Sequence, residues 1–205
     1  SVMQERQLTA TKCDVGRNAQ WATDALERWY GENLNRGHQR YARVLHAART
    51  GGAGAGKGLE ALTLDAAAPA IARATALQEM AGFLEPGSLP AIRAGLASPD
   101  PLMRRAAVET LETVDAAARL QLVAPLLEDS VRDVRVAAAS ALSDVRAQAV
   151  TDPALRAALE KAFGEYLAAQ RLNADRAEHW VNLAGFHFRQ GRVEEAEAGY
   201  AQARQ

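Results

Sequence analysis

The chain has 205 residues and a formal net charge of −1, and 48% of its residues are hydrophobic but only 5% are aromatic. This length fits one domain or two small ones, and the apolar content argues against intrinsic disorder. The 24 basic and 25 acidic residues leave no basic excess to neutralise a phosphate backbone, which disfavours general nucleic-acid binding.

The apolar residues are of the kind that favours helices. The sequence contains 46 Ala and 23 Leu but only 13 Val and 2 Ile. Ala loses no side-chain entropy in a helix, whereas buried strands favour Val and Ile. The composition therefore predicts an all-α fold. No uninterrupted apolar run is long enough to cross a membrane.

The first third of the chain is predicted to be a flexible segment, 1–16, followed by a two-helix linker, 17–58. Apolar residues at helical spacing predict helices over 19–31 and 38–50. Cys13 is the only cysteine, which excludes an internal disulfide and a Cys-x-x-Cys zinc site.

A glycine-rich stretch, GGAGAGKG at 51–58, ends this linker and is predicted to be a flexible connector. Gly51, Gly56 and Lys57 also fit the G-x-x-x-x-G-K pattern of a phosphate-binding loop. However, Gly58 stands where a Ser or Thr would hold magnesium, and a helix rather than a strand precedes the loop. Nucleotide binding through this loop therefore remains the disfavoured alternative.

An internal repeat follows over residues 59–150. Arg73, Arg104 and Arg135 are spaced by 31 residues, and Ala and Leu or Met residues recur at matching offsets around them. Each unit reads as a helix, a short turn rich in Asp, Pro and Ser, and a second helix, and either Ser98 or Asp100 can cap the helix that follows its turn. A single helix pair cannot bury its apolar stripe, but stacked pairs can.

This pattern resembles HEAT-like repeats in the short bacterial form known from bilin-lyase-type proteins. In that family a turn Asp and a helix Arg of neighbouring repeats form a ladder. The resemblance implies that Asp100, Asp129 or Asp133 pairs with Arg104 and Arg135. Arg73 has no Asp before it, so the first unit departs from the pattern.

A different repeat is predicted over residues 151–205. Seven residues occupy the places that characterise a tetratricopeptide repeat, which the stretch 177–205 resembles: Trp180, Leu183, Ala184, Gly191, Ala196, Tyr200 and Ala203. The 34-residue unit that starts at Ala177 would end beyond Gln205, so we expect a truncated repeat in a longer protein. Asn182 and Phe188 occupy places that often contact ligand in tetratricopeptide repeats, and Arg189 lies next to Phe188 in the sequence. The resemblance therefore implies that these three residues bind the partner.

Residues 9–31, with the helix and connector that follow, resemble the segment after the last haem site of multihaem c-type cytochromes. Cys13 aligns with the second cysteine of a CxxCH motif, but Ala10 and Asp14 replace the first cysteine and the histidine. Covalent haem attachment needs both thiols and the histidine. We therefore expect no cofactor in this segment, with haem confined to a parent protein, although His38 could cap a haem iron from a neighbouring domain.

No catalytic or metal site is expected. The four histidines form two pairs eight residues apart, His38 with His46 and His179 with His187, which is too far along a helix for one metal ion. The sequence thus predicts a right-handed α-solenoid that is not an enzyme. We expect it to bind a protein or peptide partner, not to bind nucleic acid and not to insert into a membrane. A free-standing structural adaptor is the other alternative, and the cytochrome resemblance implies a periplasmic or membrane-associated location.

Overall fold

The computed structural model describes residues 19–31 and 39–204. All regular secondary structure in this part of the chain is helical, which confirms the predicted fold class. The α-helices are α2 Ala19–Tyr30, α3 Gln39–Arg49, α4 Ala55–Leu64, α5 Ala70–Met80, α6 Leu89–Leu96, α7 Pro101–Thr110, α8 Ala116–Val123, α9 Arg132–Ala141, α10 Pro153–Leu172, α11 Ala177–Arg189 and α12 Val193–Gln202.

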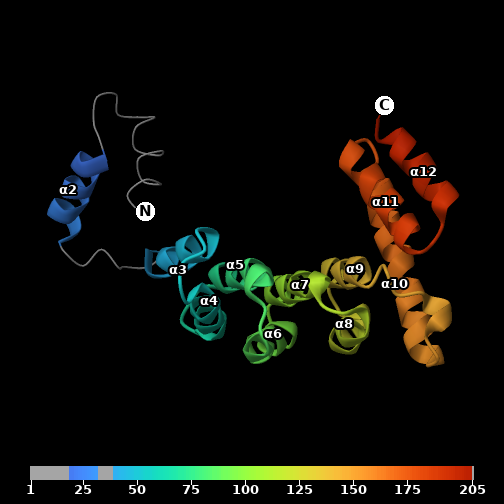
Figure 1. Cartoon of the computed structure of the whole chain (residues 1–205), viewed down its shortest axis with the longest axis horizontal. Coiled ribbons are helices and arrows are strands. Elements are labelled where there is room, and N and C mark those ends of the chain that lie inside the picture. Colours follow the sequence, from blue (N-terminus) through green and yellow to red (C-terminus); the bar gives the residue numbers. More distant parts are fainter. Residues whose placement is uncertain (1–18, 32–38, 205) are drawn as a thin grey trace.

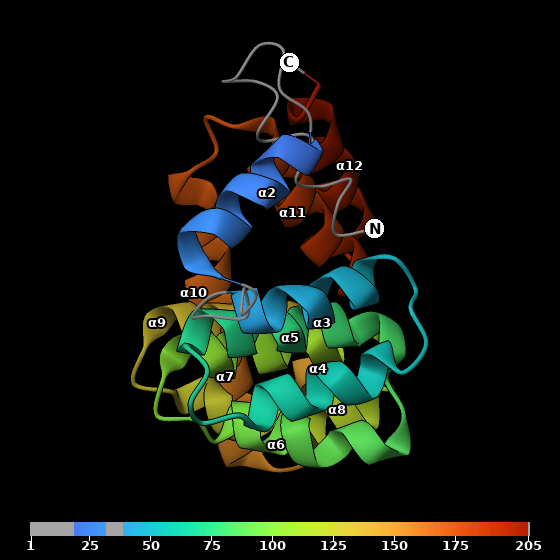
Figure 2. The same ribbon diagram turned by 90° about the vertical axis from the view of Figure 1, so that its left-hand side faces the viewer.

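The helices from α3 to α9 stack in two parallel layers (Figure 1). Helices α3, α5, α7 and α9 form one row, which we call the inner layer, and α4, α6 and α8 form the outer layer. The long helix α10 packs against α9 and leads to the pair α11 and α12, which lies on the inner-layer side of the stack in both views (Figures 1 and 2). The fold is therefore an α-solenoid with a helical hairpin at its C-terminal end.

The core lies between the two layers and continues without a break from one repeat to the next. Its largest fully buried side chains come from every unit in turn and include Leu59, Leu77, Met80, Met103, Leu111, Leu127 and Leu142. Because burial of an apolar side chain contributes about 1.5–3 kcal/mol, this shared core holds together helix pairs that are too small to be stable singly.

Small residues set the spacing between layers. A Cβ added to Gly95 in α6 would lie 2.8 Å from both the Ala107 Cβ in α7 and the Leu77 Cδ1 in α5. Gly95 is therefore the contact point where an outer helix touches two inner helices at once.

Aspartate side chains cap the starts of α7, α8 and α10. The Asp100 carboxylate accepts a hydrogen bond from the Leu102 N–H at 2.9 Å at the start of α7, and Pro101 follows as the first helical residue. Of the two predicted caps, Asp100 is thus the one that acts on the helix, while the Ser98 hydroxyl accepts from the backbone N–H of Asp100.

The glycine-rich connector is shorter than predicted, because α4 already begins at Ala55. Gly51 and Gly54 adopt positive φ values of 67° and 74° and form the turn out of α3. Gly56 and Gly58 are helical instead, and each is small because a neighbour lies close. Added Cβ atoms would be 3.3 Å from Phe83 Cβ and 3.3 Å from Val44 Cγ1, respectively. The predicted boundary at 58/59 therefore cuts through a helix.

Candidate binding site at the elbow

An arginine from one repeat bridges to the next repeat at the centre of the stack. Arg104 of α7 donates from Nε and Nη2 to the two carboxylate oxygens of Asp129, at 2.6 Å and 2.8 Å. Its Nη1 donates to the backbone carbonyls of Ser98 and Pro99 in the turn before its own helix. Of the predicted ladder residues, the structure thus brings Arg104 and Asp129 together, and Asp129 is only 6% exposed at its side chain.

Arg135 binds a turn carbonyl as Arg104 does, but it pairs with a different kind of acidic residue. Its Nη1 donates to the Asp129 backbone carbonyl at 2.7 Å, but its charged partner is Glu165 of α10 rather than an aspartate. The replacement occurs because the helix that follows is α10, a long helix outside the 31-residue repeat. Asp133 pairs with Arg105 instead, and Arg73 donates to the Thr63 carbonyl.

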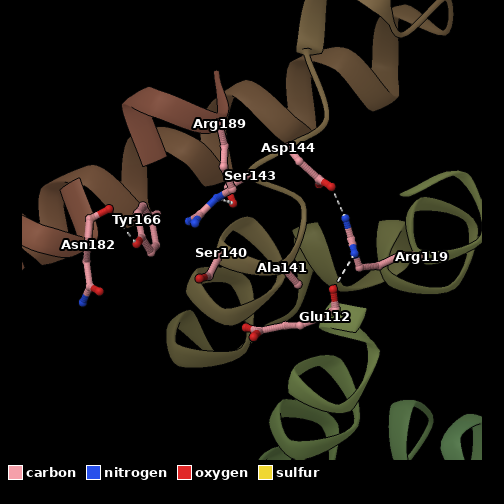
Figure 3. Close-up of a pocket in the computed structure, with 9 residues that line it drawn as sticks. All are labelled: Glu112, Arg119, Ser140, Ala141, Ser143, Asp144, Tyr166, Asn182 and Arg189. Atoms are coloured by element: carbon pink, nitrogen blue, oxygen red, sulfur yellow. Dashed lines mark hydrogen bonds and ion pairs between the residues drawn. The ribbon is translucent and has the colours of Figure 1, made fainter. Parts of the chain in front are cut away.

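A cavity of about 330 Å³ lies where α10 and α11 meet the end of the repeat stack, and we call it the elbow cavity (Figure 3). Its walls come from both modules. The repeats contribute Glu112, Arg119, Ser140, Ala141, Ser143 and Asp144, and the C-terminal helices contribute Tyr166, Asn182 and Arg189. An adjoining hollow of about 140 Å³ shares Glu112, Ser140 and Tyr166 and extends along the inner layer.

One wall of the elbow cavity is fixed by an ion pair between a buried arginine and a partly exposed aspartate. Arg119 of α8 pairs with Asp144 through Nη2, and its Nη1 donates to the carbonyls of Glu112 and Val114. The Arg119 residue is only 4% exposed. Its buried Nε–H has no hydrogen-bond acceptor within the described residues. This side chain joins the end of α7, the start of α8 and the loop after α9.

The C-terminal helices are fastened to the same loop. Arg189 Nε donates to the Ser143 hydroxyl at 2.6 Å, and Gln190 Nε2 donates to the Ser143 and Val145 carbonyls at 2.6 Å and 3.1 Å. Beneath them, Phe186 packs edge-on against Phe163 and stacks on Tyr166. The angle between the two modules is thus set by polar contacts over an aromatic core.

Opposite charges face the Tyr166 hydroxyl from two sides of the cavity. Burial raises the pKa of this phenol, Arg189 acts to lower it and Glu112 acts to raise it. Both charged side chains are therefore near enough to influence Tyr166, yet no ion pair joins them in the described part of the chain. Figure 3 shows Glu112 and Arg189 entering the cavity from different helical modules.

Two of the three predicted partner-binding residues line the elbow cavity. Asn182 and Arg189 lie on one face of α11, and the Asn182 amide donates to Gln170 of α10. Phe188 is 63% exposed but does not line the cavity, because it projects from a different side of the helix. The prediction for all three residues remains untested by these contacts.

Sequence reasoning missed Glu112, Arg119, Ser140, Ser143 and Tyr166. Arg119 had one available signal: the place 31 residues earlier holds Ser88, which is also buried and donates to Glu60. Because the residue type differs between these two places, the 31-residue spacing alone does not reveal that both hold a buried polar side chain.

The glycine-rich segment with Lys57 lies away from the elbow cavity and lines a separate hollow of about 520 Å³. Lys57 is exposed in the first turn of α4 and is preceded by α3 rather than a strand. Cys13 and His38 lie outside the described residues. Within 19–31 and 39–204, no cluster of three or more His, Cys, Asp or Glu is arranged to hold a metal ion. The same ranges include no helix that combines the length and apolar character needed to span a bilayer.

Residues 57–143 match the family model for HEAT repeats. This part of the chain is a HEAT-like repeat region. The match covers the inner and outer layers from α4 through α9, so it confirms the repeat pattern found in the sequence. Neither the curated proteins nor the solved structures include a match to the chain.

Beyond the HEAT-like repeats, α11 and α12 pack as a hairpin in which Gly199 lies against Ala184. Gly191 lies in the turn that ends α11 and has a φ of 76°, a conformation that favours glycine. These contacts fit the predicted tetratricopeptide unit, which stays a prediction.

Proposed function

We propose that this protein is a non-catalytic scaffold that binds a segment of a partner protein on its inner layer and in the elbow cavity. The observation that carries the proposal is the composite origin of that cavity: Glu112 and Ser140 belong to the HEAT-like repeats, whereas Asn182 and Arg189 belong to the C-terminal helices. A segment bound there would contact both modules at once.

The inner layer offers a polar surface that continues from the cavity. Gln78 of α5 donates to Glu109 of α7 at 2.8 Å, and Arg105 bridges Glu109 to Asp133 of α9. These links lie between successive inner helices and are partly exposed. Exposed polar groups held in fixed positions by a rigid array can select among peptide segments.

Two further parts of the proposal rest on sequence resemblance. We infer that the chain forms the C-terminal part of a larger multihaem cytochrome-like protein, and that it lies in the periplasm or at a membrane. In that setting the scaffold would dock the haem-bearing part to its partner. Several CxxCH motifs encoded upstream of Ser1 would support this parentage, and a coding region without any would contradict it.

The binding proposal is tested by display selection on the whole chain. A random dodecapeptide library on phage is selected against the wild type, and enriched peptides are synthesised and titrated by fluorescence anisotropy. We expect binding that Asn182→Ala weakens and that Gln121→Ala, on the exposed outer helix α8, leaves unchanged. Absence of any enriched peptide, or binding that depends on Gln121 and not on Asn182, would overturn the proposal.

A further inference from the structure

Four carboxylates line the elbow cavity and the adjoining hollow, and three of them have an arginine partner. Glu109 and Asp133 pair with Arg105, and Asp144 pairs with Arg119. Glu112 is exposed and forms no ion pair within the described part of the chain. It is also the carboxylate that both hollows share.

The opposite charge comes from the other module. Arg189 uses Nε for the Ser143 hydroxyl, so its two terminal nitrogens remain for a ligand. A guanidinium held by one hydrogen bond is pre-oriented for a carboxylate, because its planar donors match the two carboxylate oxygens. Glu112 and Arg189 thus present an anion and a cation on separate walls of one cavity.

The groups between them are uncharged and hydrogen-bonding. The hydroxyls of Ser140 and Tyr166 line the same cavity as the two charges, and the Tyr166 hydroxyl donates to the backbone carbonyl of Asn182 at 3.5 Å (Figure 3). Burial raises the pKa of the Tyr166 phenol, so the hydroxyl keeps the proton that it donates to Asn182, and its oxygen can accept a hydrogen bond from a ligand. Such a surface suits the backbone of a peptide between two charged side chains.

We propose that the elbow cavity recognises a dipolar peptide segment, in which a Lys or Arg side chain pairs with Glu112 and an Asp or Glu side chain pairs with Arg189. The inference rests on the proposed scaffold function and names the chemistry of its partner. Because the two charges lie on different modules, the site fixes the direction in which the segment runs. A segment with the two charges in reverse order would place like charges together, which costs affinity.

The test uses one peptide enriched in the selection described above and two derivatives, in which either the basic or the acidic residue is replaced by Gln. Each is titrated against the wild type, Glu112→Gln and Arg189→Gln. On the wild type we expect each replacement to weaken binding about tenfold, the amount that loss of one charged hydrogen bond gives. Glu112→Gln should abolish the preference for the basic residue and keep the preference for the acidic one. Arg189→Gln should do the opposite.

Matched controls separate recognition from general electrostatics. Glu197→Gln and Arg93→Gln change the same net charge at exposed positions that do not line the elbow cavity, and they should leave all three affinities unchanged. If enriched peptides bind through Asn182 but tolerate Gln at both charged places, the dipolar inference is wrong while the scaffold function stands. If no peptide is enriched, both proposals are overturned.

Discussion

The Arg104 guanidinium and the Asp129 carboxylate form a two-point ion pair between successive repeats, with N–O distances of 2.6 Å and 2.8 Å. Their side chains are only 13% and 6% exposed. The hydrogen bond from Arg104 holds the pKa of Asp129 below its ordinary value. The pair also connects two turns, because Arg104 binds the carbonyls of Ser98 and Pro99 as well.

Removing one partner of this pair is expected to be costly. Arg104→Ala leaves the Asp129 charge almost buried and should lower the free energy of unfolding by about 3 kcal/mol. Arg105→Ala removes a neighbouring arginine that is about half exposed, and should cost less than about 1 kcal/mol. Urea unfolding monitored by circular dichroism measures both values. Equal losses for the two variants would contradict a structural role specific to Arg104.

The same pair predicts a dependence of stability on pH. Because the folded state lowers the pKa of Asp129, its contribution is complete above pH ~4, the ordinary value for aspartate, and is lost as pH falls below it. Asp129→Asn should therefore be less stable than the wild type at pH 7, with a difference that shrinks toward pH 3. A difference that stays constant over this range would show that the charge of Asp129 contributes nothing.

His187 predicts a second pH effect at higher pH. Burial lowers its pKa below the ordinary value, and the nearby Arg192 adds to the lowering. The folded state thus prefers the neutral ring, so its stabilising contribution is complete above pH ~6.5 and is lost as pH falls toward the folded-state pKa. His187→Phe should flatten the change in melting temperature between pH 7.5 and 5.5. An unchanged slope would exclude His187 as its cause.

Packing at Gly95 gives a test of the layer spacing. Gly95→Ala gains helix propensity but places a methyl group 2.8 Å from Ala107 Cβ and Leu77 Cδ1, and should lose about 1–3 kcal/mol of stability. Gly164→Ala, inside α10 with no neighbour within 4 Å of the added Cβ, should gain about 0.5–1 kcal/mol. Thermal unfolding of both variants compares them. A stabilised Gly95→Ala protein would show that the layers are not in close contact there.

The joint beneath the elbow cavity depends on one aromatic side chain. Phe186 is fully buried between Phe163 and Tyr166, so Phe186→Ala should cost about 3–5 kcal/mol. Phe188→Ala, two residues later and 63% exposed, should change stability by less than about 0.5 kcal/mol. In the Phe186→Ala variant, hydrogen exchange should speed up more in α10 and α11 than in α5 and α7. Uniform loosening of all helices would contradict a separate joint.

Much of the HEAT-like region could be predicted from the sequence because its signal is periodic. Arg73, Arg104 and Arg135 recur at one spacing, and the last two do bind carbonyls six residues earlier in their turns. Even so, the acidic partner of Arg135 changed from an aspartate to Glu165, since a helix outside the repeat supplies it.

The elbow cavity was harder to foresee. It depends on how two modules meet, and that angle is set by contacts between residues 45–47 positions apart, such as Arg189 with Ser143. Neither residue is marked by the 31-residue spacing of the HEAT-like repeats. Sequence reasoning therefore made no prediction for Ser143, whereas Arg189 was predicted from the resemblance of α11 to a tetratricopeptide helix. The predicted connector at 51–58 is too long because glycines usually mark loops, whereas Gly56 and Gly58 lie in a helix and allow close packing.

The most direct test of the scaffold proposal is hydrogen exchange of the whole chain with and without a selected peptide. We predict slower amide exchange in the loop after α9 and at the ends of α7 and α11, which surround the elbow cavity, with little change in α6 and the exposed side of α8. Protection confined to α6 and α8, with none around the elbow cavity, would contradict the account.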